Sequence, residues 1–340
     1  MPGWLLGIDI GGTGSRAALV GIGDGTEVDT GIGDATGARR QLQGEVVSVD
    51  ASGSSVPEVA RALVSSAAEA WPEAFAQLRG VAVGASGLAS LVQAPERVPD
   101  ALRETALAHG APAGVRAAAA IDAVTAHLGA LGGAAGAVVA LGTGAIALGS
   151  DGHGEWRRVD GWGHLLGDRG GGAWIGLRGL ELAMRAYDGV SEEGAALLHA
   201  AEARFGTPPS WPAQLYTRHD RAAVLAGFAP DVLARAQEGD AAAERILLTA
   251  GTEAACSAVA ALGPDLPARV ALTGGLAEAM EPLRDAFADT ARHLRPEVEI
   301  VDPLGDPLDG AVRLAGRAAA HRLRACAPFV WSDSGSRRSE

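Results

Sequence analysis

The chain repeats one pattern twice, a short apolar run that ends in a glycine turn and is followed by a second apolar run. The first copy occupies residues 4–20 and turns at Gly11-Gly12-Thr13-Gly14, and the second occupies residues 138–149 and turns at Gly142-Thr143-Gly144. Apolar runs of this length around a glycine turn predict a β-hairpin. In Rossmann and P-loop proteins the glycine turn instead opens a helix. One hairpin in each half of the chain therefore predicts a duplicated sheet domain.

Strands and helices alternate along the rest of the chain, which predicts an α/β fold. Further strands are expected over residues 80–84, 117–121 and 270–273. Apolar residues at helical spacing predict helices over 57–78, 97–109, 123–131, 174–185, 191–204 and 241–262.

The length of 340 residues predicts two domains, because a single core usually stops growing at about 250–300 residues. We expect an N-terminal domain over residues 1–118 and a C-terminal domain over 119–307. A helix at about 308–325 is expected to pack back on the first domain. The last residues, 327–340, are mostly polar and are expected to form a disordered tail.

All 28 strongly basic residues are arginine, since the sequence contains no lysine. A Walker A loop, a protein kinase and a Schiff-base enzyme each need a lysine amine, so these three classes are excluded. The net charge of −13 argues against nucleic-acid or membrane partners, because both anionic surfaces attract basic patches.

Cys256 and Cys326 are too few and too far apart for a metal or redox motif, and we expect two buried, unreactive thiols. The N-terminus lacks the basic segment of a signal peptide, and no apolar run approaches the ~18 residues of a membrane span. We therefore expect a soluble cytoplasmic protein.

The two glycine turns are candidate phosphate sites, because glycine lets backbone N–H groups approach an anion closely. Thr13 and Ser15 add hydroxyl donors to the first turn, and Asp9 before it can hold Mg²⁺ through water. Two such turns would clamp a polyphosphate from both sides without lysine. An ordinary glycine hairpin is the alternative for each turn.

The strand that ends at Thr273-Gly274-Gly275 is a candidate site for adenine or ribose, with a helix-start glycine turn as the alternative. Asp122 follows a predicted strand and precedes a helix. A sugar kinase needs a carboxylate there to accept the proton of the attacking hydroxyl, and a helix N-terminus favours the ionised form. A plain helix N-cap is the alternative for Asp122.

The glycine-rich segment 161–170 contains Trp162, His164 and Asp168. A carboxylate beside an aromatic ring is typical of polyol recognition, so Asp168 is expected to accept bonds from sugar hydroxyls and Trp162 to shape the site. His164 could act as a base, although a lone histidine in a tight loop is more often structural.

With these motifs in order, residues 4–320 resemble the actin, hexokinase and heat-shock chaperone ATPase superfamily. Asp9–Thr13, Gly142–Gly144 and Thr273–Gly275 resemble its two phosphate motifs and its adenosine motif. The segment GWGHLLGDRGGGAWIG, at 161–176, is similar to one of the N-acetylglucosamine kinases in the BadF/BadG/BcrA/BcrD ATPase family. IDAVTAHLGA, at 121–130, resembles the segment with that family's catalytic aspartate.

The resemblance implies two ribonuclease H-like domains around a cleft. It also implies an ATP- and Mg²⁺-dependent kinase that acts on a small sugar and forms a homodimer. It implies that Asp122 is the general base for the sugar 6-hydroxyl and that Asp9 holds Mg²⁺ through water. The residues implied for ATP are Gly11, Gly12, Thr13, Gly14, Ser15, Gly142, Thr143, Gly144, Gly274 and Gly275. Those implied for the sugar are Asp122, Gly144, Ala145, Trp162 and Asp168.

The sequence departs from the family pattern at Arg169, where relatives have Glu, at Gly171, where they have Ser, and at Gly14, where Lys or Arg is frequent. Relatives also contact the sugar with an early-loop Asn, and this chain has none, so the region 34–56 is built differently. N-acetylglucosamine leads as substrate, with N-acetylmuramic acid, glucosamine or another hexose as alternatives.

Rival classes lack their own signatures in this sequence. A dehydratase activator needs paired cluster cysteines, a ROK glucokinase usually has a cysteine-rich zinc motif, and a filament-forming actin relative would not need the 161–176 segment. A non-catalytic sugar or nucleotide sensor would lose Asp9 or Asp122, and both are present.

Overall fold

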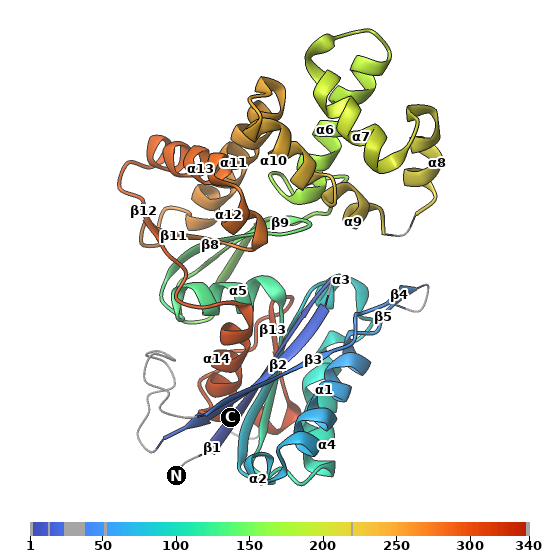
Figure 1. The fold of residues 1–340 in the computed structure, drawn as a ribbon. Coiled ribbons are helices and arrows are strands. Elements are labelled where there is room, and N and C mark those ends of the chain that lie inside the picture. Colours follow the sequence, from blue (N-terminus) through green and yellow to red (C-terminus); the bar gives the residue numbers. More distant parts are fainter. Residues whose placement is uncertain (1–2, 13, 24–37, 51–52, 219, 338–340) are drawn as a thin grey trace. The chain divides into compact units, whose positions relative to one another are not determined.

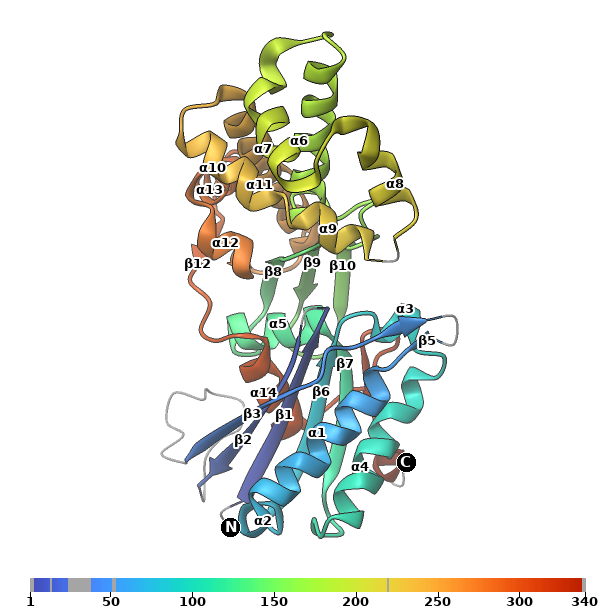
Figure 2. The same ribbon diagram turned by 45° about the vertical axis from the view of Figure 1, so that its right-hand side comes forward.

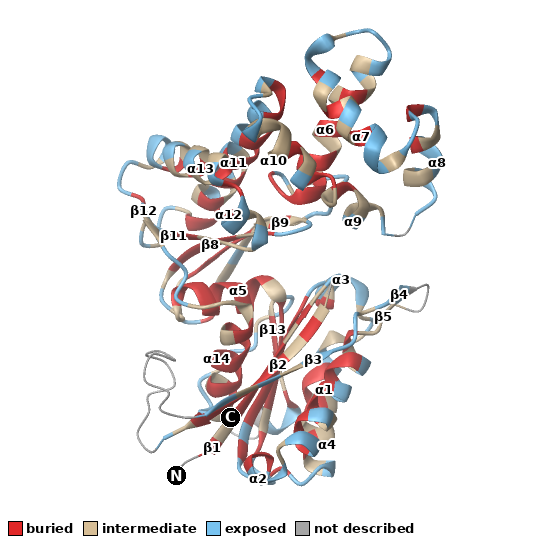
Figure 3. Cartoon of the chain, viewed as in Figure 1, coloured by how far each residue is buried: buried red, intermediate tan, exposed pale blue. Residues whose placement is uncertain are grey.

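The computed structural model describes residues 3–12, 14–23, 38–50, 53–218 and 220–337. The chain divides into two compact units (Figure 1). Unit 1 comprises Met1–Ala135, Ser150–Trp156 and Asp302–Glu340, and unit 2 comprises Gly136–Gly149 and Arg157–Val301. Each unit contains one main sheet with its own buried core (Figure 3). The boundary after Ala135 differs from the expected one at 118, because the helix that follows the 116–121 strand packs within unit 1.

Unit 1 is built on a six-stranded sheet with the order β13-β7-β6-β1-β2-β3. The first predicted hairpin is confirmed, since β1 and β2 pair antiparallel around the glycine turn. β1, β6 and β7 run parallel, so their carboxyl ends share one edge of the sheet. The strands are β1 Gly3–Gly11, β2 Gly14–Ile22, β3 Arg39–Gly44, β6 Leu78–Ala85, β7 Arg116–Ile121 and β13 Val330–Ser332, with a separate pair β4 Val49–Asp50 and β5 Gly53–Ser54.

Helices cover both faces of this sheet (Figure 2). α1 and α4 contact each other and the sheet, while α5 and α14 pack together on the strands β1, β6 and β7. A Cβ added at Gly7 would lie 2.5 Å from Val312 N in α14, so glycine permits this close approach. The helices are α1 Val56–Ala70, α2 Pro72–Phe75, α3 Leu88–Leu91, α4 Val98–Ala108, α5 Asp122–Leu131 and α14 Pro307–Ala319.

The helix expected over 57–78 is wrong as a single element. It ends at Ala70, and a short second helix begins at Pro72. Proline disfavours helical geometry in the residue before it and has no N–H to continue the ladder, which separates the two pieces.

The expected disordered tail over 327–340 differs from the structure at residues 330–332. These residues form β13, which pairs antiparallel with β7. The side chain of Asp333 is buried, accepts the N–H of Ala117 at 2.7 Å and pairs with Arg116 at 3.3 Å. Polar composition therefore does not prevent order here, because the charged group that ends the strand has buried partners.

Unit 2 is built on a five-stranded sheet with the order β10-β9-β8-β11-β12. β11 pairs parallel with both β8 and β12. The second predicted glycine turn joins β8 to its neighbour β9. The strands are β8 Gly136–Leu141, β9 Ala145–Ser150, β10 Trp156–Asp160, β11 Arg269–Thr273 and β12 Glu299–Val301; β9 and β10 each extend by one residue, Ser150 and Trp156, into the part assigned to unit 1.

Helices provide most of the unit 2 core. The small buried residues of α11 let α10 and α13 pack closely against it. The helices are α6 Gly172–Tyr187, α7 Ala195–Phe205, α8 Trp211–Tyr216, α9 Arg221–Ala226, α10 Ala229–Gln237, α11 Ala241–Leu262, α12 Gly275–Ala279 and α13 Glu281–Leu294.

α11 is also the helix, among the described residues, that is long and apolar enough to span a membrane. Half of its most apolar window is buried inside unit 2, which is the pattern of a core helix. The expectation of two buried thiols is wrong. Cys256 is exposed on α11, and Cys326, which lies after α14, is half-buried.

Candidate functional site

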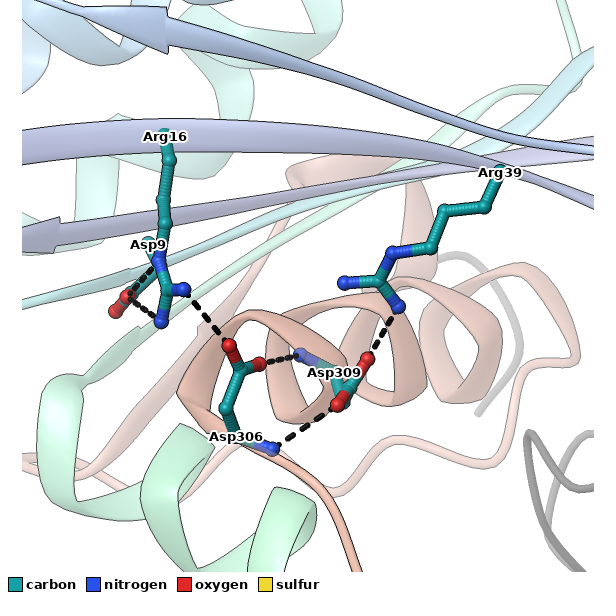
Figure 4. A network of polar contacts seen from close by, with 5 residues as sticks. All are labelled: Asp9, Arg16, Arg39, Asp306 and Asp309. Carbon is teal, nitrogen blue, oxygen red and sulfur yellow. Dashed lines mark hydrogen bonds and ion pairs between the residues drawn. The ribbon is translucent and has the colours of Figure 1, made fainter. Parts of the chain in front are cut away.

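The carboxyl edge of the unit 1 sheet contains Asp9, which lies opposite Arg16 in the hairpin register. Nε and Nη2 of Arg16 both donate to Oδ2 of Asp9, each at 3.0 Å (Figure 4). The Asp9 side chain is 15% exposed. The predicted metal-binding carboxylate is thus held in place by a neighbouring guanidinium.

Arg16 connects Asp9 to the N-terminus of α14. Its Nη1 lies 2.7 Å from Oδ2 of Asp306. Asp306 and Asp309 form a capping box, in which each side chain accepts the other's backbone N–H at 2.9 Å, and Arg39 of β3 pairs with Asp309 (Figure 4). Sequence reasoning missed this network. The Asp-Pro-x-Asp spacing at 306–309 was the available signal, because it marks a helix start.

The charge state of Asp9 reflects these surroundings. Burial raises the pKa of Asp9, and the nearby carboxylates of Asp306 and Asp122 raise it further, while the charge and hydrogen bond of Arg16 oppose the rise. Asp9 therefore takes up a proton at a higher pH than an ordinary aspartate.

Asp122 follows the last residue of β7 at the same sheet edge. It is the first residue of α5 rather than the expected N-cap, which is Ile121. Its Oδ1 accepts the N–H of Ala123 at 2.9 Å. Gly84 of β6 lies between β1, which contains Asp9, and β7, which ends just before Asp122. A Cβ at Gly84 would lie 2.2 Å from Thr125 Oγ1, so glycine lets α5 approach the sheet.

The first glycine turn is open on its outer side. A Cβ added at Gly12 or Gly14 would meet no atom of the described residues within 4 Å, so another molecule can approach this backbone. Gly11 and Gly14 pair across the hairpin. Thr13 lies outside the described residues, and so does the part of the early loop over 34–37.

Ser15 does not point to the same face as Asp9. Adjacent residues of a strand alternate between faces, and the Ser15 hydroxyl donates to Glu45 O at 2.6 Å on the α1 side. The candidate phosphate donor is buried and already has an acceptor.

The second glycine turn lies at the N-terminus of α6 in unit 2. The N–H groups of Gly172 and Ala173 donate to the carbonyls of Gly142 and Thr143, both at 2.9 Å. Thr143 is exposed, and a Cβ at Gly142 would meet no atom within 4 Å in the part of the chain that the structure describes. This turn is therefore fixed by the helix behind it and accessible in front.

Asp168 packs directly on the second glycine turn. A Cβ added at Gly144 would lie 2.4 Å from Oδ2 of Asp168, and Oδ1 accepts the N–H of Gly163 at 2.9 Å. Ala145, the first residue of β9, is buried behind this contact. Two segments that the sequence identified separately, 142–145 and 161–176, are thereby brought together.

Burial also raises the pKa of Asp168, and the charge of Asp160 adds to the rise. The hydrogen bond from Gly163 and the charges of His164 and Arg158 act in the opposite direction. The backbone of Asp168 has a φ of +56°, in the left-handed region that few non-glycine residues adopt. Such a conformation persists where surrounding contacts hold it.

Asp160 supplies these contacts and was missed by sequence reasoning. Its Oδ1 and Oδ2 accept the N–H groups of Asp168 and Arg169, at 2.7 and 2.8 Å. A Cβ at Gly167 would lie 2.1 Å from Oδ1 of Asp160. An aspartate directly before a glycine-rich loop was the available signal, since Asp side chains bond to nearby backbone N–H groups.

The other predicted residues of this loop lie around Asp168. Trp162 is 63% exposed, and its ring stacks under the guanidinium of Arg158 at 4.0 Å. Nε2 of His164 is buried without a hydrogen-bond partner among the described residues. Arg169 is one of the departures from the family pattern, and its Nη1 lies 3.4 Å from Oε1 of Glu253 in α11.

The third glycine junction lies beside the second. Gly274 has a φ of +101°, and a Cβ there would lie 2.2 Å from Leu141 O, at the end of β8. Gly275 begins the short helix α12. The turn therefore does start a helix, which was the alternative interpretation. A Cβ at Gly275 would meet no described atom within 4 Å.

The described residues contain no group of three or more metal-ligating side chains. This donor set does not build an all-protein metal cage. It does fit Mg²⁺, which usually keeps several waters and binds one or two carboxylates together with substrate phosphates. Asp9 and the open glycine turn beside it would supply such a site.

The model of the BadF/BadG/BcrA/BcrD ATPase family matches residues 6–315. An N-acetyl-D-glucosamine kinase of Dictyostelium discoideum is 31% identical over 189 residues, which is 53% of this chain and 59% of that protein. An N-acetylmuramic acid/N-acetylglucosamine kinase of Clostridium acetobutylicum is 38% identical over 58 residues, which is 17% of this chain and 19% of that protein. The chain thus spans about three fifths and one fifth of these curated relatives.

Solved structures match over nearly the whole chain. A protein of Chromobacterium violaceum, assigned as an N-acetylglucosamine kinase, has a TM-score of 0.62 and 29% identity, with 92% of this chain and 98% of that chain covered. A ROK family glucokinase of Streptomyces griseus, solved with glucose and AMPPNP, has a TM-score of 0.55 and 18% identity, with 94% and 100% covered. The second likeness shows the fold alone.

Proposed function

The chain belongs to the BadF/BadG/BcrA/BcrD ATPase family, and we propose that it is an ATP-dependent sugar kinase whose acceptor is the 6-hydroxyl of N-acetylglucosamine. Similarity to N-acetylglucosamine kinases in sequence and in fold supports this class. ATP and the sugar are the two substrates, and N-acetylglucosamine 6-phosphate is the product.

One observation carries the proposal: Asp9 and Asp122 stand at the same carboxyl edge of parallel strands, close enough for the charge of Asp122 to raise the pKa of Asp9. Phosphoryl transfer to an alcohol needs a base for the hydroxyl proton and a carboxylate near the metal. We assign Asp122 to the proton of the sugar hydroxyl. We assign Asp9 to water molecules around Mg²⁺.

The sugar contacts are assigned to unit 2. The carboxylate of Asp168 is fixed by Gly163 and packs on Gly144, so it can accept two hydroxyl bonds from a polyol without reordering its loop. Trp162 belongs to the same loop and is 63% exposed, and we assign it to shaping the sugar site. Gly144 and Ala145 are assigned to the same group of sugar contacts.

The phosphate contacts are assigned to the open backbone of Gly11, Gly12, Gly14, Gly142 and Thr143, and the adenosine contact to Gly274 and Gly275. Thr13 remains part of this proposal on the sequence motif alone. Bound Mg²⁺ would neutralise charge that builds up on the transferred phosphoryl group. Ser15 is better explained as a structural residue, because its hydroxyl is bonded to Glu45.

We extend the proposal to a cytoplasmic homodimer, by analogy with relatives. Sedimentation equilibrium across a protein concentration series would test the oligomeric state. A monomer at every concentration would reject the dimer and leave the reaction untouched.

The experiment that tests the function is an ADP-release assay with Mg-ATP across N-acetylglucosamine, N-acetylmuramic acid, glucosamine and glucose. Turnover that is highest with N-acetylglucosamine supports the proposal. Highest turnover with another member of the panel would keep the kinase and change the substrate. No turnover with any sugar, in a protein that still binds ATP, would favour a sensor over an enzyme.

A further inference from the structure

The chain of unit 2 bends sharply where β10 ends. Asp160 and Gly161 both have left-handed backbones, with φ values of +61° and +75°. Glycine adopts this conformation readily, and a Cβ at Gly161 would lie 2.8 Å from Cδ1 of Ile146 in β9. An aspartate adopts it much less often, and it persists where surrounding contacts hold it. The bend leads directly into Trp162, so whatever holds it also sets where this ring begins.

Arg158 of β10 holds this bend. Its Nε donates to the carbonyl oxygen of Asp160 at 2.8 Å, and its Nη2 donates to the carbonyl oxygen of Gly161. The two acceptors thus belong to the two left-handed residues. A planar guanidinium can bond both at once, and hydrogen bonds from a charged donor are stronger than neutral ones. The half-buried Arg158 side chain therefore fixes the path of the chain into the loop.

The same guanidinium covers one face of the Trp162 ring. Cζ of Arg158 lies 4.0 Å from the ring centroid, at the distance of a cation–π contact. The Trp162 residue is nevertheless 63% exposed. Because one face is covered by Arg158, this exposure belongs mainly to the opposite face and the edge of the ring. Trp162 is therefore held from one side and open to a ligand on the other.

Trp162 begins beside the carboxylate that we assign to the sugar. A Cβ at Gly167 would lie 3.1 Å from Cβ of Trp162, and the N–H of Gly163 donates to Oδ1 of Asp168 at 2.9 Å. The residues on either side of this contact are thus the neighbours of Trp162 and Asp168 in the chain. Burial raises the pKa of Asp168, and the charge of Arg158 opposes that rise, so the guanidinium also acts on this carboxylate.

From these contacts we propose that Arg158 is a positioning residue of the sugar site, which holds the bend after β10 and one face of Trp162 so that the other face packs against the sugar ring. The C–H groups of a pyranose ring give it an apolar face, which suits the face of an aromatic ring. Asp168 then accepts the hydroxyl groups at the rim of the same sugar. The inference rests on the proposed function, because it requires a sugar at Asp168.

Steady-state kinetics with N-acetylglucosamine and ATP test this role. We expect Arg158→Gln to raise KM for the sugar about fivefold or more and to leave kcat and KM for ATP within about twofold, because positioning of the sugar alone is lost. Arg158→Lys keeps the charge but has no planar fork, so it should also raise KM for the sugar. Arg157→Gln is the matched control, since it removes a charge from the adjacent residue of β10, whose side chain points to the opposite face. It should keep the wild-type KM.

Tryptophan fluorescence without ATP measures sugar binding separately from turnover. N-acetylglucosamine should change the emission of the wild type, and most of this change should be absent in Trp162→Phe. Arg158→Gln should need about fivefold more sugar than the wild type for half of the change, in line with its KM. Melting temperatures of the free variants check that each one folds.

Three outcomes would overturn the inference and leave the proposed function standing. One is a wild-type KM for the sugar in Arg158→Gln or Arg158→Lys, and another is an equal rise in Arg157→Gln. The third is a sugar-induced change in emission that is as large in Trp162→Phe as in the wild type. A wild-type protein that neither binds nor phosphorylates any sugar would instead reject the proposed function, and the inference would fall with it.

Discussion

Among single residues, Asp122 is the one whose chemistry is most directly testable. In Asp122→Asn the side chain can still accept the N–H of Ala123, so the start of α5 should be retained. The amide cannot take the proton of a sugar hydroxyl, and we expect kcat to fall by about 10²–10⁴-fold. The dissociation constant of ATP, measured by calorimetry, should stay within twofold. Near-normal turnover would reduce Asp122 to a helix-start residue.

Asp168 leads to a prediction about pH. Because burial raises the pKa of Asp168, its carboxylate becomes neutral at a higher pH than an ordinary aspartate as the solution is acidified. We expect kcat/KM for the sugar to fall on the acid side, above the usual titration range of aspartate. The matched variant Asp168→Asn should have low kcat/KM and should lack that acid limb. An unchanged limb in the variant would assign the titration to another group.

The raised pKa of Asp168 also affects stability, in the opposite direction. Acidification is expected to lower kcat/KM, but it removes an unfavourable contribution to the free energy of unfolding. A carboxylate whose pKa is raised in the folded protein costs stability at pH values above its folded pKa. The cost shrinks as the pH falls below that pKa, and it is gone below the pKa of the unfolded chain. Asp168 therefore lowers the free energy of unfolding near neutral pH. A functional site commonly accepts such a cost, because the ionised group is needed for binding.

Asp160 is a positioning residue, since it bonds the backbone of Asp168 and Arg169 rather than a substrate. We expect Asp160→Ala to release the left-handed backbone at Asp168 and to raise KM for the sugar about tenfold or more, with a much smaller change in KM for ATP. Asp240→Ala, which removes the N-cap of α11, is the control for lost stability alone. Equal changes in both KM values would mean a general loss of structure.

At the scale of elements, the turn between β8 and β9 offers a matched pair of glycines. A Cβ at Gly144 would lie 2.4 Å from the Asp168 carboxylate, whereas a Cβ at Gly142 would meet none of the described residues within 4 Å. We expect Gly144→Ala to raise KM for the sugar at least fivefold by displacing Asp168. Gly142→Ala should affect ATP more than the sugar, because the added methyl occupies the proposed phosphate side. Steady-state kinetics with each substrate varied in turn separate the two effects.

Elements with a strong local signal were predicted from the sequence, and long-range contacts were not. The hairpin around Gly11–Gly14 and the helix over 241–262 follow from apolar runs, glycine turns and periodicity. The capping box at Asp306 and the loop bonds of Asp160 needed knowledge of which distant backbone groups lie nearby. Ser15 was misread because strand alternation places it on the face opposite Asp9.

At the scale of the whole molecule, the boundary between the two units is set by the packing of helices and not by their order in the sequence. α5 and α14 come from distant parts of the chain, and Gly129 and Gly310 let them touch: a Cβ at Gly310 would lie 1.8 Å from Thr125 O. This helix pair fixes α5 to unit 1. The sequence placed the boundary before α5 instead, because a strand–helix unit reads the same in either domain.

The C-terminal segment provides the prediction for the whole molecule. Val330 and Trp331 are buried, and Asp333 pairs with Arg116, whose side chain is 11% exposed. Deleting residues 327–340 removes this strand, opens the edge of β7 and leaves Arg116 without that carboxylate. Burial of each large side chain is worth about 1.5–3 kcal/mol. We expect the free energy of unfolding of unit 1 to fall by at least about 3 kcal/mol, with faster hydrogen exchange in β7. Deleting only residues 338–340 is the matched control, and equal exchange in both variants would mean that the terminal strand adds no stability.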